Sequence, residues 1–299
     1  MVLGGHPEVP QLRSMLFVPG NRTALVDKAE AAGADAIILD LEDAVPAVGK
    51  EAARREVSDF LNGRRATDVP VFVRINALAA AIAWDDLQAV VGLGLSGVLV
   101  PKVESAREVI VADRVLGWLE EKAQLPIGKT VIIPVLETAR GARAAHEIGS
   151  ASPRTAYMGG LGVRGGDVER SVGYRWSAAG DETYVMRSST LLEVRAAGVP
   201  HPVSGMWADV KDVDGLAAFA RQNRALGYEG MMCIHPAHVP VINAAFTPTP
   251  EELDRDRRLV ECMRAAAENG SGATVFEGEM IDEAMVVTAL ARLEMNGGA

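Results

Sequence analysis

Eight short apolar runs, each followed by a helical pattern, constrain the fold of this 299-residue chain more than any other feature. The runs recur about every 30 residues and end in polar or glycine-containing turns: Ser14–Val18, Ala36–Leu41, Val71–Ile75, Gly97–Val100, Val131–Leu136, Thr155–Met158, Val203–Trp207 and Met231–Ile234. Between them, apolar periodicity with glycine stop signals predicts helices, among them Thr23–Ala32, Lys50–Leu61, Ser105–Lys122, Gly141–Ile148, Thr183–Ala197 and Val213–Leu226. This alternation indicates an α/β fold with a parallel sheet.

Two architectures share that alternation. An open, doubly wound sheet of eight strands is one, but eight repeats in about 240 residues is the usual size of a closed (β/α)8 barrel. We therefore expect a TIM barrel over residues 1–245 as the catalytic domain.

A proline pair marks the end of the repeats. Phe246-Thr-Pro-Thr-Pro250 cannot continue a helix, because each proline also restricts the residue before it. Beyond it the sequence predicts a helix at Glu251–Asn269, a Gly270–Gly272 loop and a last helix near Asp282–Met295. We expect residues 246–299 to form a C-terminal helical extension with a lid-like loop.

The amino-acid composition indicates which binding partners and which cellular location to expect. The 40 acidic against 30 basic side chains give a formal charge of −10, which repels nucleic acid and anionic membranes. The two cysteines, Cys233 and Cys262, have no metal-type or redox-type spacing, and we expect reduced thiols. Residues 1–11 lack the pattern of a signal peptide, and no apolar run is long enough to span a bilayer. These features predict a cytoplasmic protein.

Charged residues recur where the predicted strands end, which in such a barrel is the edge that carries the active site. They are Glu42, Asp43, Arg74, Lys102, Glu137, Asp167, Asp209 and His235. Any one of them could be a turn or capping residue, but together they predict a shared polar site. Glu137 and Asp167 form the natural carboxylate pair for a hard cation such as Mg²⁺, and Arg74 beside them suits a substrate carboxylate. That combination indicates an acidic substrate.

A glycine motif gives a competing signal. Residues 160–165 match G-x-G-x-x-G after a predicted strand, as in dinucleotide-binding folds. The residues that follow lack the long helix and second strand of such a fold, and the motif falls in the sixth repeat. We interpret the glycines as a mobile active-site loop.

At these positions the sequence resembles the citrate lyase β-subunit-like family of the HpcH/HpaI aldolase superfamily, which includes malyl-CoA and citramalyl-CoA lyases. The matching strings span almost the whole chain: residues 13–21, 39–45, 73–76, 100–104, 137–138, 234–236, 246–252 and 277–282. The chain departs from the family pattern at Val203-Ser204, where Ile-Asp is usual, at Met231, where Lys is usual, and in a longer approach to Asp167.

The resemblance implies a role for each matched residue. Glu137 and Asp167 would hold Mg²⁺, with Mn²⁺ as the alternative metal, and Arg74 would grip the substrate's carboxylate. The acyl-CoA or substrate pocket would be lined by Phe17, Lys28 and Asp209. Asp282 would be the catalytic acid/base, delivered by the C-terminal segment of a neighbouring subunit in a homotrimer or hexamer. The alternative for Asp282 is a carboxylate at a helix N-terminus that the helix dipole favours.

The resemblance also implies an activity, the cleavage of a 3-hydroxyacyl-CoA such as malyl-CoA or citramalyl-CoA by a Mg²⁺-dependent carbon-carbon lyase. Three alternatives stay open: a malyl-CoA-type thioesterase, a CoA-independent keto-acid aldolase, and a carrier-dependent citrate lyase β subunit. Fold alone does not rank them.

Overall fold

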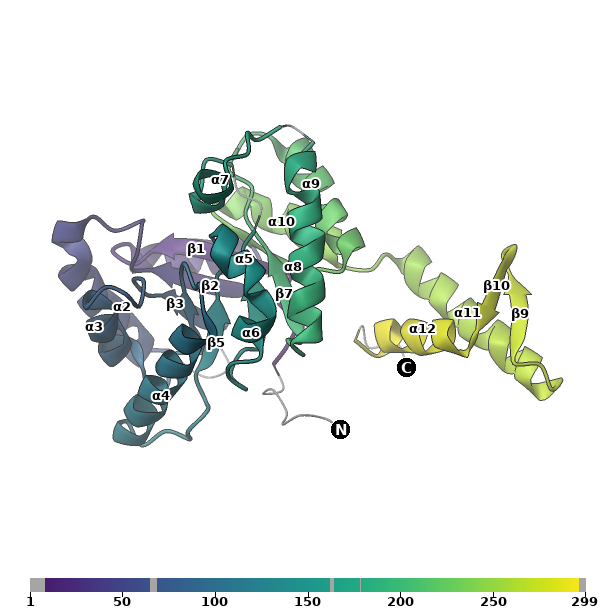
Figure 1. Ribbon diagram of the computed structural model, residues 1–299, viewed down its shortest axis with the longest axis horizontal. Helices are drawn as coiled ribbons and strands as arrows, with labels where there is room; N and C mark the ends of the chain where they lie inside the picture. The colour runs from purple at the N-terminus through teal and green to yellow at the C-terminus, as the bar shows by residue number, and fades with distance from the viewer. Residues whose placement is uncertain (1–8, 65–68, 162–163, 178, 296–299) are drawn as a thin grey trace. The chain divides into compact units, whose positions relative to one another are not determined.

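The structure, a computed structural model, describes residues 9–64, 69–161, 164–177 and 179–295. The chain divides into two compact units, Met1–Phe246 and Thr247–Ala299 (Figure 1). The residues before Val9, on which part of the signal-peptide argument rests, lie outside the described ranges.

The first unit contains eight parallel strands. They are β1 (Ser14–Pro19), β2 (Ala36–Asp40), β3 (Val71–Arg74), β4 (Gly97–Val100), β5 (Val131–Pro134), β6 (Tyr157–Gly159), β7 (His201–Ser204) and β8 (Gly230–Cys233). Their order is β5-β4-β3-β2-β1-β8-β7-β6, and bridges from Ile132 to Thr155 and from Val135 to Gly159 join the two ends. The predicted (β/α)8 barrel is confirmed, and the doubly wound alternative is wrong.

Helices follow the strands and lie outside them (Figure 1). They are α1 (Val26–Ala31), α2 (Lys50–Asn62), α3 (Ile82–Val90), α4 (Ala106–Lys122), α5 (Ala139–Arg143), α6 (Ala145–Gly149), α7 (Asp167–Val172), α8 (Tyr184–Ala196), α9 (Val213–Leu226) and α10 (Val239–Phe246). The helix predicted at Gly141–Ile148 is two short helices, α5 and α6. Among the described residues, α3, α7 and α10 are additions to the prediction.

Strand alternation sorts side chains into two cores. Ile37 and Leu39 of β2 face the helices, whereas Ile38 packs inside the barrel with Phe72 of β3 and Leu99 of β4. Asp40 and Arg74 have the same parity as Ile38 and Phe72, so they point inward at the carboxyl ends of their strands. Charged side chains therefore lie at the carboxyl end of the barrel interior, and apolar side chains fill the rest of it.

The second unit has its own small core. It consists of α11 (Pro250–Glu268), the antiparallel strands β9 (Ala273–Phe276) and β10 (Glu279–Asp282), and α12 (Glu283–Met295). Apolar side chains from all four elements pack together: Leu259, Met263, Phe276, Ile281, Val286 and Ala289. Thr249 begins α11 with a capping box to Glu252. The two predicted helices are present, and the hairpin between them is an addition to the prediction.

No helix in the described part of the chain is both long and apolar enough to cross a membrane.

Candidate active site

Arg74 is held in place at the carboxyl end of the barrel by two carboxylates. Its Nε and Nη2 donate to the two oxygens of Asp40 at 2.8 and 2.7 Å, and its Nη1 lies 3.1 Å from Glu42 Oε2. The guanidinium carbon lies 4.8 Å from the centre of the Phe17 ring. Since a guanidinium has five N–H donors, these contacts fix its orientation and leave donors for a ligand.

Asp40 is almost fully buried, at 2% exposure. Burial acts to raise its pKa, but the hydrogen bonds from Arg74 and from the backbone N–H groups of Glu42 and Ala44 lower it below the usual value. Asp40 is therefore an ionised partner of Arg74. Asp40 was not among the predicted site residues, although an acid that ends an apolar strand was a usable signal.

Lys102 connects the acidic groups of the site. Its Nζ lies 2.5 Å from Glu42 Oε1, 3.2 Å from Asp167 Oδ2 and 3.7 Å from Asp43 Oδ2. Burial acts to lower its pKa, but the surrounding carboxylates raise it well above the ordinary value, so the ammonium stays charged. Asp167 also pairs with Arg170, one turn further along α7.

Glu137, three residues after β5, carries the most shifted carboxyl of the site. Burial raises its pKa to about 7, and the charges of Glu42 and Asp167 add to the rise, while Arg74 and Lys102 oppose it. The two carboxylates predicted as metal ligands are thus near enough to influence each other. Burial is the largest cause, so the pKa of Glu137 stays raised in spite of the two cations.

This arrangement fits a hard divalent cation. Among the residues that the structure describes, no three His, Cys, Asp or Glu side chains converge as a complete ligand set. Mg²⁺ does not need one, because it keeps several waters or substrate oxygens beside one or two carboxylates. A cation bound by Glu137 and Asp167 would also stabilise the ionised form of Glu137, which burial disfavours.

The residues predicted to line the substrate pocket are placed differently from one another. Phe17 of β1 stacks on Arg74 and so joins the cluster. Lys28 is exposed on α1, and Asp209 is exposed in the loop after β7, where its Oδ1 accepts from Lys211 N at 3.0 Å. Asp209 also lines a 280 Å³ cavity with Trp207 and Arg164. Neither Lys28 nor Asp209 contacts the Arg74 cluster in the described structure.

Asp282 is the last residue of β10 in the second unit. Its Oδ1 accepts from the backbone N–H groups of Ala284 and Met285, at 3.1 and 3.4 Å, so within this unit it caps the start of α12. The carboxylate is exposed, and a capping carboxylate keeps a free oxygen.

The glycine-rich segment after β6 lies partly outside the described residues, since it includes residues 162 and 163. Gly160 has a packing reason of its own. It has φ of +102°, and a Cβ there would lie 2.5 Å from Val135 Cγ1. Close approach between β5 and β6 therefore explains this glycine without a dinucleotide.

Comparison with known proteins gives consistent results. The family model described as HpcH/HpaI aldolase/citrate lyase matches residues 13–236. A citrate lyase subunit beta-like protein of Deinococcus radiodurans is 39% identical, covering 93% of this chain and 95% of the relative. The citrate lyase subunit beta of Escherichia coli is 32% identical, covering 95% of this chain and 94% of the relative.

A solved structure resembles the whole chain. It is the protein CitE of Mycobacterium tuberculosis in complex with magnesium, acetoacetate and coenzyme A, with a TM-score of 0.77, 33% identity, and coverage of 96% of this chain and 98% of that one. The match includes both units. The chain therefore belongs to the HpcH/HpaI aldolase/citrate lyase family, whose citrate lyase β-like members are lyases.

Proposed function

We propose that this protein is a Mg²⁺-dependent carbon-carbon lyase that cleaves a 3-hydroxyacyl-CoA, such as malyl-CoA or citramalyl-CoA, into an acyl-CoA and a keto acid or aldehyde. The observation that carries the proposal is the buried carboxyl of Glu137, which lies near the charges of Arg74 and Asp167 at the carboxyl end of the barrel. The solved relative with magnesium, acetoacetate and coenzyme A supports it, because that set contains a metal, a keto acid and a CoA.

Glu137 and Asp167 would hold the metal, with Mn²⁺ as an alternative. When bound, Mg²⁺ would polarise the substrate oxygen at the carbon where the bond breaks. Arg74, oriented by Asp40, would hold the substrate's carboxylate with its remaining donors. Lys28 and Asp209 would contact the CoA portion, and the exposed Lys28 ammonium suits a phosphate group.

Asp282 would be the acid/base, contributed by the second unit of a neighbouring subunit in a homotrimer or hexamer. As the carbon-carbon bond breaks, the substrate's 3-hydroxyl releases its proton to water and its oxygen becomes the carbonyl of the departing keto acid or aldehyde. The electron pair of the broken bond passes into the enolate of the acyl-CoA, whose carbon takes a proton from the Asp282 carboxyl. In the condensing direction, the same group removes that proton. The protein's free cysteines suit the reducing cytoplasm.

A second candidate is a β subunit that acts on a carrier-bound acid. It is favoured by the E. coli relative, which is a subunit of a citrate lyase. Its chemistry at the metal would be the same, with a carrier protein in place of free CoA.

The test is mass-spectrometric product analysis with Mg²⁺ and a panel of hydroxyacyl-CoA thioesters. We expect the wild type to release an acyl-CoA and a keto acid or aldehyde, and Asp167→Ala to lose at least about 100-fold in kcat. Asp59→Ala, which removes an exposed acid of α2, is the control and should match the wild type.

Other products would assign a different activity to the protein. Free CoA plus the intact hydroxy acid would make the protein a thioesterase. Turnover of CoA-free keto acids would make it an aldolase, and turnover only with an acylated carrier protein would favour the second candidate.

A further inference from the structure

Two residues outside the active site hold the turn that carries Glu42 through hydrogen bonds. They are Lys50 of α2, which bonds the turn directly, and Asp86 of α3, which acts through Asn76. We infer that they are positioning residues for metal binding: by fixing Glu42 as the nearer partner of Lys102, they limit the ion pair between Lys102 and Asp167 that a cation must displace. This inference rests on the proposed Mg²⁺ site.

The peptide groups just after β2 are fixed on every side. Leu41 N donates to Arg74 O at 2.9 Å, and Glu42 N donates to Asp40 Oδ1 at 2.8 Å. The carbonyls of Leu41 and Glu42 both accept from Lys50 Nζ, at 2.8 and 2.7 Å. Without Lys50, these two carbonyls would lose a charged donor close to a buried side chain.

Asp86 supports the same turn from α3. Its Oδ2 accepts from Asn76 N and Nδ2 at 2.9 and 2.6 Å, and Asn76 Nδ2 also donates to Leu41 O at 3.1 Å. Its Oδ1 accepts from Arg54 Nε at 2.9 Å. Asp86 and Asn76 are 1% and 6% exposed, and the buried charge of Asp86 is paired with Arg54.

The consequence for the metal site follows from the position of Lys102. Its ammonium is shared between Glu42, at 2.5 Å, and Asp167, at 3.2 Å. A displaced Glu42 would leave Asp167 as the main partner of Lys102, and this stronger ion pair would compete with a metal for the same carboxylate. The network thus acts through Glu42 and Lys102 and contacts neither proposed ligand.

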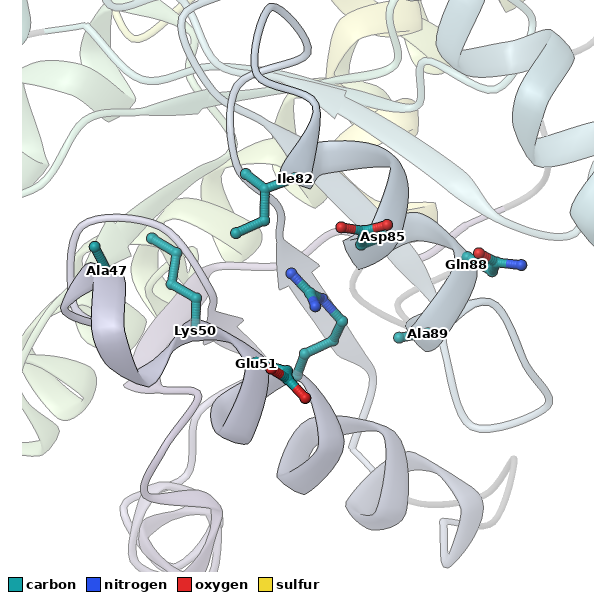
Figure 2. A pocket seen from close by; sticks show the side chains of 8 residues that line it. Ala47, Lys50, Glu51, Ile82, Asp85, Gln88 and Ala89 are labelled. Atoms are coloured by element: carbon teal, nitrogen blue, oxygen red, sulfur yellow. The ribbon is translucent and has the colours of Figure 1, made fainter.

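A groove of about 570 Å³ lies against this network, between α2 and α3. Figure 2 shows Lys50 and Glu51 on one wall and Asp85 and Gln88 on the other. Because the groove is open to solvent, a side chain of different shape can be placed at Lys50 without overpacking. The Lys50 ammonium itself is already committed to the two carbonyls.

The test is isothermal titration of the metal-free full chain with Mg²⁺, with no substrate present. We expect Lys50→Met and Asp86→Asn to raise the Kd for Mg²⁺ about tenfold, the size of effect that loss of an outer partner of a metal ligand has. Lys50→Arg, which keeps a cation and donors, should restore part of the affinity. Arg55→Met, which removes an exposed cation of the same helix, should bind as the wild type does.

A double-mutant cycle separates positioning from loss of structure. In a Lys102→Met background no ammonium can move to Asp167, so adding Lys50→Met should change the Kd less than about twofold. Equal losses in both backgrounds would overturn the inference, as would wild-type affinity in both Lys50→Met and Asp86→Asn. If the wild type binds no Mg²⁺, the metal site of the proposed function fails together with the inference, whereas metal binding without cleavage of any thioester removes the activity alone.

Discussion

At the residue scale, the site consists of charges that the barrel buries in pairs. Asp40 and Arg74 satisfy each other, and Lys102 is shared by Glu42 and Asp167. Lys102 itself has φ of +55°, a conformation that non-glycine residues seldom adopt and that its contacts must hold in place. Glu137 differs because burial raises its pKa to about 7 in spite of the nearby cations Arg74 and Lys102.

The raised pKa of Glu137 predicts a pH-dependent metal affinity. A carboxyl with a pKa of about 7 is mostly protonated at pH 6 and mostly ionised at pH 8. Since a cation binds the ionised form, we expect the Kd for Mg²⁺ to be about tenfold higher at pH 6 than at pH 8, with a proton released on binding. Isothermal titration in buffers of different ionisation enthalpy measures both quantities. An affinity that is flat between pH 6 and 8 would contradict the assignment.

The same group links pH to the stability of the metal-free protein. Its pKa in the folded state is raised above the ordinary 4.5, so its contribution is favourable below that value and is lost as the pH rises through about 7. Urea unfolding should therefore show the metal-free wild type losing stability from pH 5 to 8. Glu137→Gln is the control and should lose less over that range.

At the scale of elements, apolar patterning predicted the barrel strands and most helices because the strands of the barrel are buried on both faces. The observed ends of some strands differ from the predicted ones, because side-chain contacts there outweigh the apolar pattern. Trp207, predicted inside the seventh strand, lies beyond β7 and packs on Trp176 and Phe219. The hairpin β9–β10 was missed because Val275 and Met280 are exposed, so alternation gives only a weak signal there.

For the candidate site, the sequence predicted candidate residues but not how they pair. Position at a strand end was enough to select Arg74, Glu137 and Asp167 as candidates. The pairing of Arg74 with Asp40 was not, since pairing depends on the register of β2 against β3, in which Asp40 lies opposite Arg74. Register between strands more than 30 residues apart is a tertiary property.

Closure of the barrel between β5 and β6 predicts an effect of Gly160. A Cβ there meets Val135 Cγ1 at 2.5 Å in a backbone with φ of +102°. We expect Gly160→Ala to lower the free energy of unfolding by about 1–3 kcal/mol more than Gly128→Ala does. Gly128 is matched, with φ of +96° and no atom within 4 Å of the position that a Cβ would take. Urea unfolding measures the difference, and equal losses in the two variants would show that the contact with Val135 is relieved without cost.

At the scale of the whole molecule, the proposed site residues are divided between two units. The barrel carries Arg74, Glu137 and Asp167, whereas Asp282 belongs to a unit with a separate core. The Asp282 carboxylate is exposed at the start of α12, and its capping bonds hold it in a fixed orientation there. An exposed, oriented acid on a compact unit is suited to complete a site on another chain.

Subunit complementation tests that arrangement. Glu137→Gln should inactivate the barrel, and Asp282→Asn should remove the acid while it preserves a good helix cap. If the tail serves a neighbouring barrel, random mixing of the two inactive chains at equal amounts gives about one quarter of sites with an intact barrel and an intact tail, and about that fraction of wild-type activity. Glu283→Gln, which changes the adjacent exposed acid, should be active alone. Native mass spectrometry shows whether mixed oligomers form. If they form and the mixture stays inactive, each tail serves the barrel of its own chain, because neither variant chain carries both Glu137 and Asp282.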